Sequence, residues 1–439
     1  MKNYIYIISV LMFLSCENDL KINDTWKDIP IIYSILNSGT GEDADGSNFS
    51  DTSPLSNFNF DDDNEPDINY NHYVRVQKSF LGSESAYSYT NAYDSLYYNT
   101  NNLSVWMELV DPNYSGNVPP AQIPLELVNE DELLDSDIVK DFGLFNNDNH
   151  YLYKLPNQNP NATDLCQGDC DNINKKYKLF VLNYLTGDTT SSETNIVEPI
   201  KMTRPRSTGS VSVLKLGLDV PISIQIKPSK NAKMYSISLV FNYMEQSKED
   251  YLFDVELGND LPTTGIIYKS IDWTLSDELA SEQQILGLTN STISKTIYGS
   301  QFFEFLTTQI SSVSDSSPEF YRYPLNTIYQ GTHNGVVAGL YHRCVDLNIV
   351  AVNSELYTYL NANAPSYGLN QERPQYNNIE NGLGHFSSRS ILNLSNLRID
   401  QSTMDSISFG QVTRNLNFAC FNTLGSSGLS VNFGYDCEE

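Results

Sequence analysis

Positively charged side chains are scarce in this chain of 439 residues. It has 26 lysine and arginine residues against 54 aspartate and glutamate residues, so its formal net charge is −28 at pH 7. This balance argues against nucleic-acid partners, because polynucleotide binding depends largely on cations that contact phosphates. Charged residues of both signs make up only 18% of the chain, whereas hydrophobic residues make up 40%. That composition is too apolar for a disordered chain and predicts globular domains.

The sequence also lacks the short motifs of common hydrolases and nucleotide-binding proteins. It contains no HExxH, no GxSxG and no glycine-rich phosphate loop. Among its five histidines only His333 and His342 are close in sequence, and their spacing does not place them on one helical face. No spacing pattern singles out a carboxylate pair for glycoside hydrolysis. We therefore expect no catalytic activity and assign no catalytic residue.

Long hydrophobic runs are absent apart from one at the N-terminus. A short basic start precedes an almost entirely apolar run from Tyr4 to Leu14, which ends at Ser15-Cys16. The run is shorter than the roughly 20 residues that a membrane-spanning helix needs, and it is typical of a signal peptide. A small residue followed by cysteine resembles the lipobox of bacterial lipoproteins, in which that cysteine is acylated. We predict lipidation at Cys16, and an ordinary secretory peptide is the alternative.

Acidic and amide residues directly follow this cysteine, at Glu17, Asn18 and Asp19. Such a start resembles the signal that sends lipoproteins of Bacteroidota to the outer face of the outer membrane. We expect a protein that is held in the outer membrane by its acyl chains and exposed at the cell surface. The periplasmic face of that membrane is the alternative.

Five further cysteines cannot all form pairs, because their number is odd. They are Cys166, Cys170, Cys344, Cys420 and Cys437. Disulfides form outside the cytoplasm, and the predicted pairs are Cys166 with Cys170 and Cys420 with Cys437. A zinc site is the alternative for the first pair, although no second Cys or His pair lies nearby. Cys344 leads into an apolar run and is expected to be a buried free thiol.

Most of the remaining pattern is that of β-strands. Apolar or alternating runs of strand length recur at residues 29–36, 73–77, 103–109, 177–182, 222–226, 235–240, 272–275 and 347–352. Short amphipathic helices are predicted at residues 131–142, 300–310 and 354–360. The predicted fold class is mainly β. An N-terminal immunoglobulin- or fibronectin-like β-sandwich is followed by a second β-sandwich-like domain with a few short helices.

The predicted organisation has four parts. Residues 1–15 form the signal peptide, 16–28 the tether, 29–200 the N-terminal domain and 201–439 the C-terminal domain. The boundary between the two domains is placed within a cluster of proline and basic residues at positions 198–206. Residues 37–69 are rich in Gly, Ser, Asp and Asn, and we expect a long acidic surface loop there.

Calcium is the best of the weak metal candidates. Asp43 and Asp45, and likewise Asp61 and Asp63, place hard oxygen ligands at alternate positions, as a Ca²⁺ loop requires. Neither run completes the twelve-residue pattern, so a solvated acidic loop is the favoured interpretation. We therefore expect no cofactor, with Ca²⁺ as the alternative.

Tyrosine is abundant, with 29 residues, and five of them gather in one Ser/Asn-rich stretch. These five are Tyr87, Tyr89, Tyr93, Tyr97 and Tyr98. Exposed tyrosines would offer a platform for a sugar ring or a partner protein, because each provides a rigid ring with a polar hydroxyl. Tyrosines on a half-buried strand would instead pack into the core. The sequence leaves both interpretations open.

Three segments carry a resemblance to a known group of proteins. They are residues 28–37 (DIPIIYSILN), residues 72–82 (HYVRVQKSFLG) and residues 376–386 (YNNIENGLGHF). These segments are similar to parts of uncharacterised Bacteroidota lipoproteins. The resemblance implies a surface lipoprotein of two β-rich domains, and it supplies no catalytic residue. Many such lipoproteins sit beside TonB-dependent transporters or other outer-membrane machines.

The expected function is therefore a non-catalytic binding or accessory subunit at the outer membrane, with an outer-membrane barrel protein as its partner. One alternative is a glycan- or nutrient-binding partner of a TonB-dependent transporter. A second is an accessory subunit of a secretion or outer-membrane assembly machine, which would present a flat apolar or aromatic patch. A third is an enzyme acting on polysaccharide or peptide, which would require a cleft with convergent carboxylates or a histidine.

Overall fold

The structure is a computed structural model that describes sixteen stretches of the chain, one of them a single residue. These are residues 27–40, 72–79, 97–110, 122–129, 151–156, 176–205, 213–217, 221–258, 262, 264–314, 317–324, 331–333, 336–338, 344–364, 375–422 and 430–437. The described chain is mainly β, as predicted, with a few short helices. None of its helices is long and apolar enough to cross a membrane.

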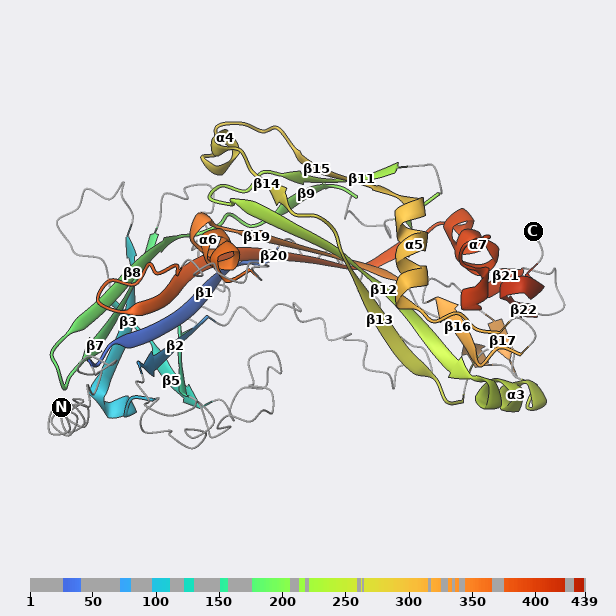
Figure 1. Cartoon of the computed structure of the whole chain (residues 1–439), viewed down its shortest axis with the longest axis horizontal. Coiled ribbons are helices and arrows are strands. Elements are labelled where there is room, and N and C mark those ends of the chain that lie inside the picture. Colours follow the sequence, from blue (N-terminus) through green and yellow to red (C-terminus); the bar gives the residue numbers. More distant parts are fainter. Residues whose placement is uncertain are drawn as a thin grey trace, which may run out of the picture.

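The first half of the described chain forms a β-sandwich (Figure 1). One layer contains β1 (Pro30–Thr40), β2 (Tyr73–Lys78), β6 (Tyr151–Lys154) and β5 (Glu126–Asn129). The other contains β4 (Gln122–Pro124), β3 (Leu103–Val110), β7 (Lys176–Asn183) and β8 (Thr189–Asn195). Side chains of β3 and β7 alternate between buried and partly exposed, so every second residue enters the core between the layers.

The second half is built on four strands that continue the first layer. They are β12 (Met234–Ser247), β13 (Ile267–Thr274), β19 (Val345–Val352) and β20 (Leu383–Ile399), and the joined sheet has the order β13-β12-β19-β20-β1-β2-β6-β5. These four strands contribute to the hydrophobic core of the second half. A three-stranded sheet of β15 (Ile293–Tyr298), β11 (Pro221–Lys227) and β9 (Lys201–Arg204) contributes to it as well. Helix α5 (Gly299–Gln309) packs Phe302, Phe303 and Leu306 into that core.

The remaining elements are short. The helices are α3 (Lys248–Glu256), α4 (Glu282–Ile285), α6 (Ser354–Asn363) and α7 (Gln401–Phe409), with 3₁₀ turns η2 (Thr100–Asn102), η5 (Arg414–Leu416) and η6 (Gly434–Asp436). The strands are β10 (Val213–Leu214), β14 (Glu278–Leu279), β16 (Phe320–Pro324), β17 (Gly331–His333), β18 (Val336–Ala338), β21 (Ala419–Asn422) and β22 (Ser430–Phe433).

Strand β20 belongs to both halves of the molecule. Its first part pairs in parallel with β1, and its later part pairs in antiparallel with β19. Phe386 near its start enters the first core, whereas Leu394 and Leu397 enter the second. Gly384 permits the close approach to β1, because its φ is +111° and a Cβ there would lie 1.9 Å from the carbonyl oxygen of Ile32. The domain boundary at residue 200 stays a prediction. A single boundary of this kind does not account for β20, which contributes to both cores.

Several predicted elements are confirmed. The eight predicted strands within the described residues are present, and the helices expected at 300–310 and 354–360 correspond to α5 and α6. The acidic loop predicted at 37–69 is wrong for its first residues, because β1 continues to Thr40 and Asn37 pairs with Arg389 of β20. Residues 41–69 lie outside the described residues. Composition alone could not reveal that these polar residues are buried in a strand. The helix expected at 131–142 lies outside the described residues.

Two buried histidines distinguish the first half. His72 and His385 are each only 4% exposed, and burial lowers the pKa of each side chain to about 4. Both therefore stay neutral at pH 7, well above that value. In the unfolded chain the same groups titrate near pH 6.5.

We predict that these histidines make the protein sensitive to acid. The unfolded state binds their protons first, so the free energy of unfolding falls as the pH drops from about 6.5 towards 4, by about 3 kcal/mol per histidine at pH 4. Urea unfolding of the wild type, His72→Gln and the double variant His72→Gln/His385→Gln between pH 7 and pH 4 tests this. Each substitution should remove about 3 kcal/mol of the loss. Identical pH profiles for all three proteins would contradict it.

Candidate functional site

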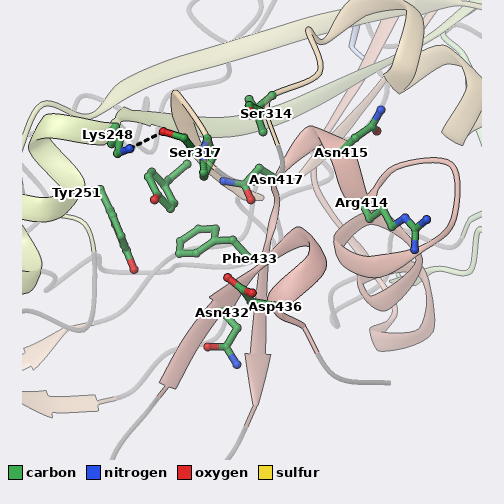
Figure 2. A pocket seen from close by; sticks show the side chains of 13 residues that line it. Lys248, Tyr251, Ser314, Ser317, Arg414, Asn415, Asn417, Asn432, Phe433 and Asp436 are labelled. Atoms are coloured by element: carbon green, nitrogen blue, oxygen red, sulfur yellow. Dashed lines mark hydrogen bonds between the residues drawn. The ribbon is translucent and has the colours of Figure 1, made fainter.

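A cleft opens near the C-terminal end of the chain, between α3, β16, η5 and the segment formed by β22 and η6 (Figure 2). Its volume is about 300 Å³. It is lined by Lys248, Tyr251, Val313, Ser314, Ser317, Pro318, Tyr321, Arg414, Asn415, Asn417, Asn432, Phe433 and Asp436. Most of these side chains are polar, and three are aromatic.

The three aromatic rings form a compact group on one side of the cleft. Tyr251 of α3 stacks on Tyr321 of β16, with ring centroids 3.8 Å apart and an angle of 19° between the planes. Phe433 of β22 meets both rings edge-on, at 5.5 and 4.8 Å. Burial raises the pKa of both tyrosines, and the nearby Asp436 carboxylate raises it further. Both hydroxyls therefore stay protonated at neutral pH, and each can donate and accept a hydrogen bond.

Amide and hydroxyl groups also line the cleft. The Nδ2 atom of Asn417 donates to the carbonyl oxygen of Phe320 at 2.9 Å, and Nδ2 of Asn415 donates to Oγ of Ser312 at 3.0 Å. The Oδ1 atom of Asn415 is buried and accepts no hydrogen bond from the described residues. A buried polar atom of this kind usually has a water or ligand partner.

The charges at the cleft differ in balance from those of the whole chain. Lys248 and Arg414 line it together with one carboxylate, Asp436. The Nζ atom of Lys248 donates to Oγ of Ser317 at 2.6 Å (Figure 2). Two cations and one anion give the lining a formal charge of +1, in a chain whose net charge is −28. No cluster of metal-binding side chains occurs within the described residues.

Local sequence features fix the elements that carry these residues. Ser247 caps α3 by accepting a hydrogen bond from the backbone of Asp250 at 3.2 Å. Gly434 has a φ of +47°, and a Cβ at this position would lie 2.5 Å from the carbonyl oxygen of Arg414. The predicted disulfide between Cys420 and Cys437 is present and ties β21 to the end of η6. The wall that carries Phe433 is thereby closed into a loop.

A buried ion pair lies beneath the cleft. The side chain of Arg322 on β16 is 1% exposed, and its Nε donates to Oε2 of Glu245 on β12 at 2.8 Å. Its Nη1 donates to the carbonyl oxygens of Ser311 and Leu416 at 2.9 and 2.7 Å. Burial alone would raise the pKa of Glu245, but hydrogen bonds from Lys269 and Arg322 outweigh this and lower it. One guanidinium therefore joins β12, β16 and both loops that reach the cleft rim.

Only two of the five candidate tyrosines lie within the described residues. Tyr98 is buried in the first core, and its hydroxyl donates to Oδ1 of Asp28 at 2.6 Å. Tyr98 therefore follows the packing interpretation and offers no exposed platform. Tyr97 accepts a hydrogen bond from Gln77 at 3.2 Å through its hydroxyl.

Some of the other predicted site residues lie within the described residues, and others lie outside them. Cys344 is buried and unpaired, as predicted, and burial raises the pKa of its thiol. Several candidates lie outside the described residues, namely Cys16, Tyr87, Tyr89, Tyr93, Cys166, Cys170, Asp43, Asp45, Asp61 and Asp63. Their roles stay predictions.

Sequence reasoning missed the cleft altogether. Its lining comes from residues near positions 250, 320, 415 and 433, which are far apart in the chain. The signals that existed were local, such as the cap at Ser247 followed by acids in the first turn of α3. Nothing in the sequence indicated that Tyr251 and Tyr321 would stack.

Comparison with known proteins assigns no family to this chain. No family model and no curated protein matches it. Among solved structures, the B domain of a biofilm-associated protein is 10% identical at a TM-score of 0.15, covering 85% of this chain and 88% of that one. A BSP domain of a biofilm-associated protein is 8% identical at a TM-score of 0.15, covering 85% of this chain and 62% of that one. Likenesses of this size carry no conclusion about fold or function.

We predict that Arg322 is essential to the stability of the half that carries the cleft. The substitution Arg322→Leu leaves Glu245 buried with only Lys269 beside it, and breaking such a pair costs about 3 kcal/mol or more. Urea unfolding measures the change. The double variant Arg322→Met/Glu245→Gln should recover part of the loss, because no buried charge then lacks its partner.

A surface pair supplies the control. Lys176 and Glu193 form an exposed ion pair at 2.9 Å, and Lys176→Ala should cost less than about 1 kcal/mol. If Arg322→Leu lowered the free energy of unfolding by no more than Lys176→Ala does, the prediction that the buried pair stabilises this half would be contradicted.

Proposed function

We propose that the chain is a non-catalytic binding protein of the cell surface and that its C-terminal cleft binds a sugar unit of a glycan. The observation that carries this proposal is the stacked pair of Tyr251 and Tyr321, which lines one cleft together with amide and hydroxyl side chains. Its volume of about 300 Å³ lies at the small end of ligand-binding pockets. A site of that size suits a single sugar ring better than an extended chain.

The chemistry of the lining matches the two kinds of surface on a sugar. The C–H face of a pyranose ring packs on an aromatic ring, and tyrosine adds a hydroxyl at the edge of that contact. Sugar hydroxyls both donate and accept, as do the side-chain amides of Asn415 and Asn432.

The same lining favours binding over hydrolysis. Glycoside hydrolysis uses two carboxyl groups on either side of the scissile bond. Among the residues that line the cleft, Asp436 supplies one carboxylate, and none is a histidine. A sugar bound there would meet a single acidic group.

The arrangement of the molecule is compatible with the predicted lipid anchor. The described chain begins at residue 27, just before β1, and β1 lies at the end of the molecule opposite to α3 (Figure 1). A chain tethered through Cys16 would then present the cleft away from the membrane. Lipidation and surface display are part of the proposal.

Glycan binding by the mature acylated chain in mild detergent tests this function. We expect binding to immobilised oligosaccharides, with at least about a tenfold loss of affinity for Tyr251→Ala, because the stacked ring is removed. Tyr184→Ala, at a 60% exposed tyrosine between β7 and β8, is the matched control and should bind like the wild type. Bound glycans should be recovered uncleaved.

Two outcomes would contradict the proposal. One is the absence of binding across both neutral and acidic glycans. The other is an equal effect of Tyr251→Ala and Tyr184→Ala, which would show that the cleft is not the binding site. Release of shorter sugars would favour an enzyme instead.

A second candidate function rests on the outer side of α3. Leu252, Phe253, Val255 and Leu257 are each about half exposed (47–59%), which is unusual for neighbouring apolar residues. The exposed acids Glu249 and Glu256 lie in the same helix. This surface suits an accessory subunit that contacts an outer-membrane barrel protein. The contact surface of that partner would be apolar, with basic residues at its edge that face Glu249 and Glu256.

A mild-detergent pull-down followed by mass spectrometry tests the second candidate. A stoichiometric barrel protein should accompany the wild type and be lost with Phe253→Asp, because a buried unpaired charge opposes docking. Tyr251→Ala, on the cleft side of the same helix, should retain the partner. Recovery of the wild type alone would remove this candidate and leave glycan binding unaffected.

A further inference from the structure

The turn between β7 and β8 carries two neighbouring apolar side chains into solvent. Tyr184 is 60% exposed and Leu185 is 72% exposed. In β7, directly before them, Tyr177, Leu179 and Val181 are no more than 2% exposed. Single exposed apolar residues are common on protein surfaces, but an adjacent pair at the tip of a hairpin indicates a contact with something apolar.

Hydrogen bonds hold this turn in one conformation. The backbone N–H of Gly187, whose φ is +77°, donates to the carbonyl oxygen of Asn183 at 2.8 Å. The N–H of Leu185 donates to Oδ1 of Asn183 at 3.0 Å, and the N–H of Tyr184 donates to the carbonyl oxygen of Asn102 at 2.9 Å. The two apolar side chains therefore project from a fixed support, which reduces the entropy lost on binding.

The same turn is tied to the point where the described chain begins. Nδ2 of Asn183 donates to Oδ2 of Asp28 at 2.9 Å, and the hydroxyl of Tyr98 donates to the other oxygen of that carboxylate at 2.6 Å. The turn and the start of β1 thus lie at the same end of the molecule (Figure 1). Asp28 follows Cys16, the predicted lipidation site, by twelve residues, which span at most about 40 Å. A membrane that holds Cys16 is therefore within reach of this turn.

We propose that Tyr184 and Leu185 insert into the interfacial region of a lipid bilayer and form a second, non-covalent contact with the membrane. This inference rests on the lipid anchor of the proposed function and does not depend on glycan binding. Tyrosine suits the bilayer interface because its ring is apolar and its hydroxyl reaches the headgroups. Once acyl chains hold the protein, the second contact is intramolecular and needs little affinity of its own.

The charge of the chain indicates which lipids this contact favours. A net charge of −28 is repelled by an anionic lipid surface. Residues 184–187 (YLTG) carry no charge themselves. We therefore expect the contact to favour zwitterionic lipids. Because α3 lies at the opposite end of the molecule, the contact would also direct the C-terminal cleft away from the membrane (Figure 1).

Tryptophan fluorescence of the acylated full chain in phosphatidylcholine vesicles tests the contact. The chain has three tryptophans, so each variant is compared with the wild type and only the added fluorescence is read. Leu185→Trp should lose most of its added fluorescence when the acyl chains of the lipids carry bromine, which quenches only rings in contact with it. Leu288→Trp is the matched control. Leu288 is 73% exposed and follows α4, which lies away from the start of β1 (Figure 1), so this variant should keep its fluorescence.

A charge at the turn separates insertion from mere proximity to the membrane. Adding Tyr184→Asp to the Leu185→Trp chain leaves the anchor and its distance from the turn unchanged, but a carboxylate is costly to place in lipid. The added tryptophan should then keep its fluorescence in brominated vesicles. Both positions are exposed, where substitutions rarely affect folding.

The possible results distinguish this inference from the anchor on which it rests. The mass of the N-terminal peptide shows whether Cys16 is acylated, and flotation shows whether the chain is bound to the vesicles. A chain that is not acylated overturns the anchor and this inference together. If an acylated, vesicle-bound Leu185→Trp chain is quenched no more than Leu288→Trp, or if Tyr184→Asp leaves the quenching unchanged, this inference is overturned and the anchor stands.

Discussion

The parallel pairing of β1 with β20 is the contact on which both halves of this molecule depend. These strands are separated by about 350 residues, and every hydrogen bond between them requires a long loop to close first. Phe386 of β20 is part of the first core, so this core is complete only when β20 has paired with β1. The carbonyl oxygen of Asn378, which precedes β20, accepts a hydrogen bond from Oγ of Ser192 in β8 at 2.7 Å. The first sandwich is therefore not closed by its own segment of the chain.

In the second half, buried polar contacts hold several loops in place around the cleft. Arg322 does this with one buried guanidinium that contacts Glu245, Ser311 and Leu416. Buried Gln246 acts similarly, because its side chain donates to Asp254 and to the carbonyl of Thr264 and accepts from Tyr323. Fully satisfied networks of this kind hold their members in one geometry. The rings at the cleft are therefore carried by a fixed frame.

Sequence reasoning succeeded where structure is decided locally. Alternation at residues 103–109 and 177–182 predicted β3 and β7, and the predicted pair of Cys420 with Cys437 is a disulfide in the structure. It failed for α3, whose apolar residues face outward and give no stripe directed at a core. It also failed for Asn37, where polar composition indicated a loop although β20 covers the strand. The failure at Asn37 concerns a contact between distant segments, which no local pattern encodes.

The acidic composition of the chain limits what its cleft can bind. A net charge of −28 repels anions over the whole surface, but at physiological salt this repulsion is screened beyond about 8 Å. Within that distance local groups decide the outcome. The cleft balances Asp436 with Lys248 and Arg414, which suits a neutral or weakly acidic ligand.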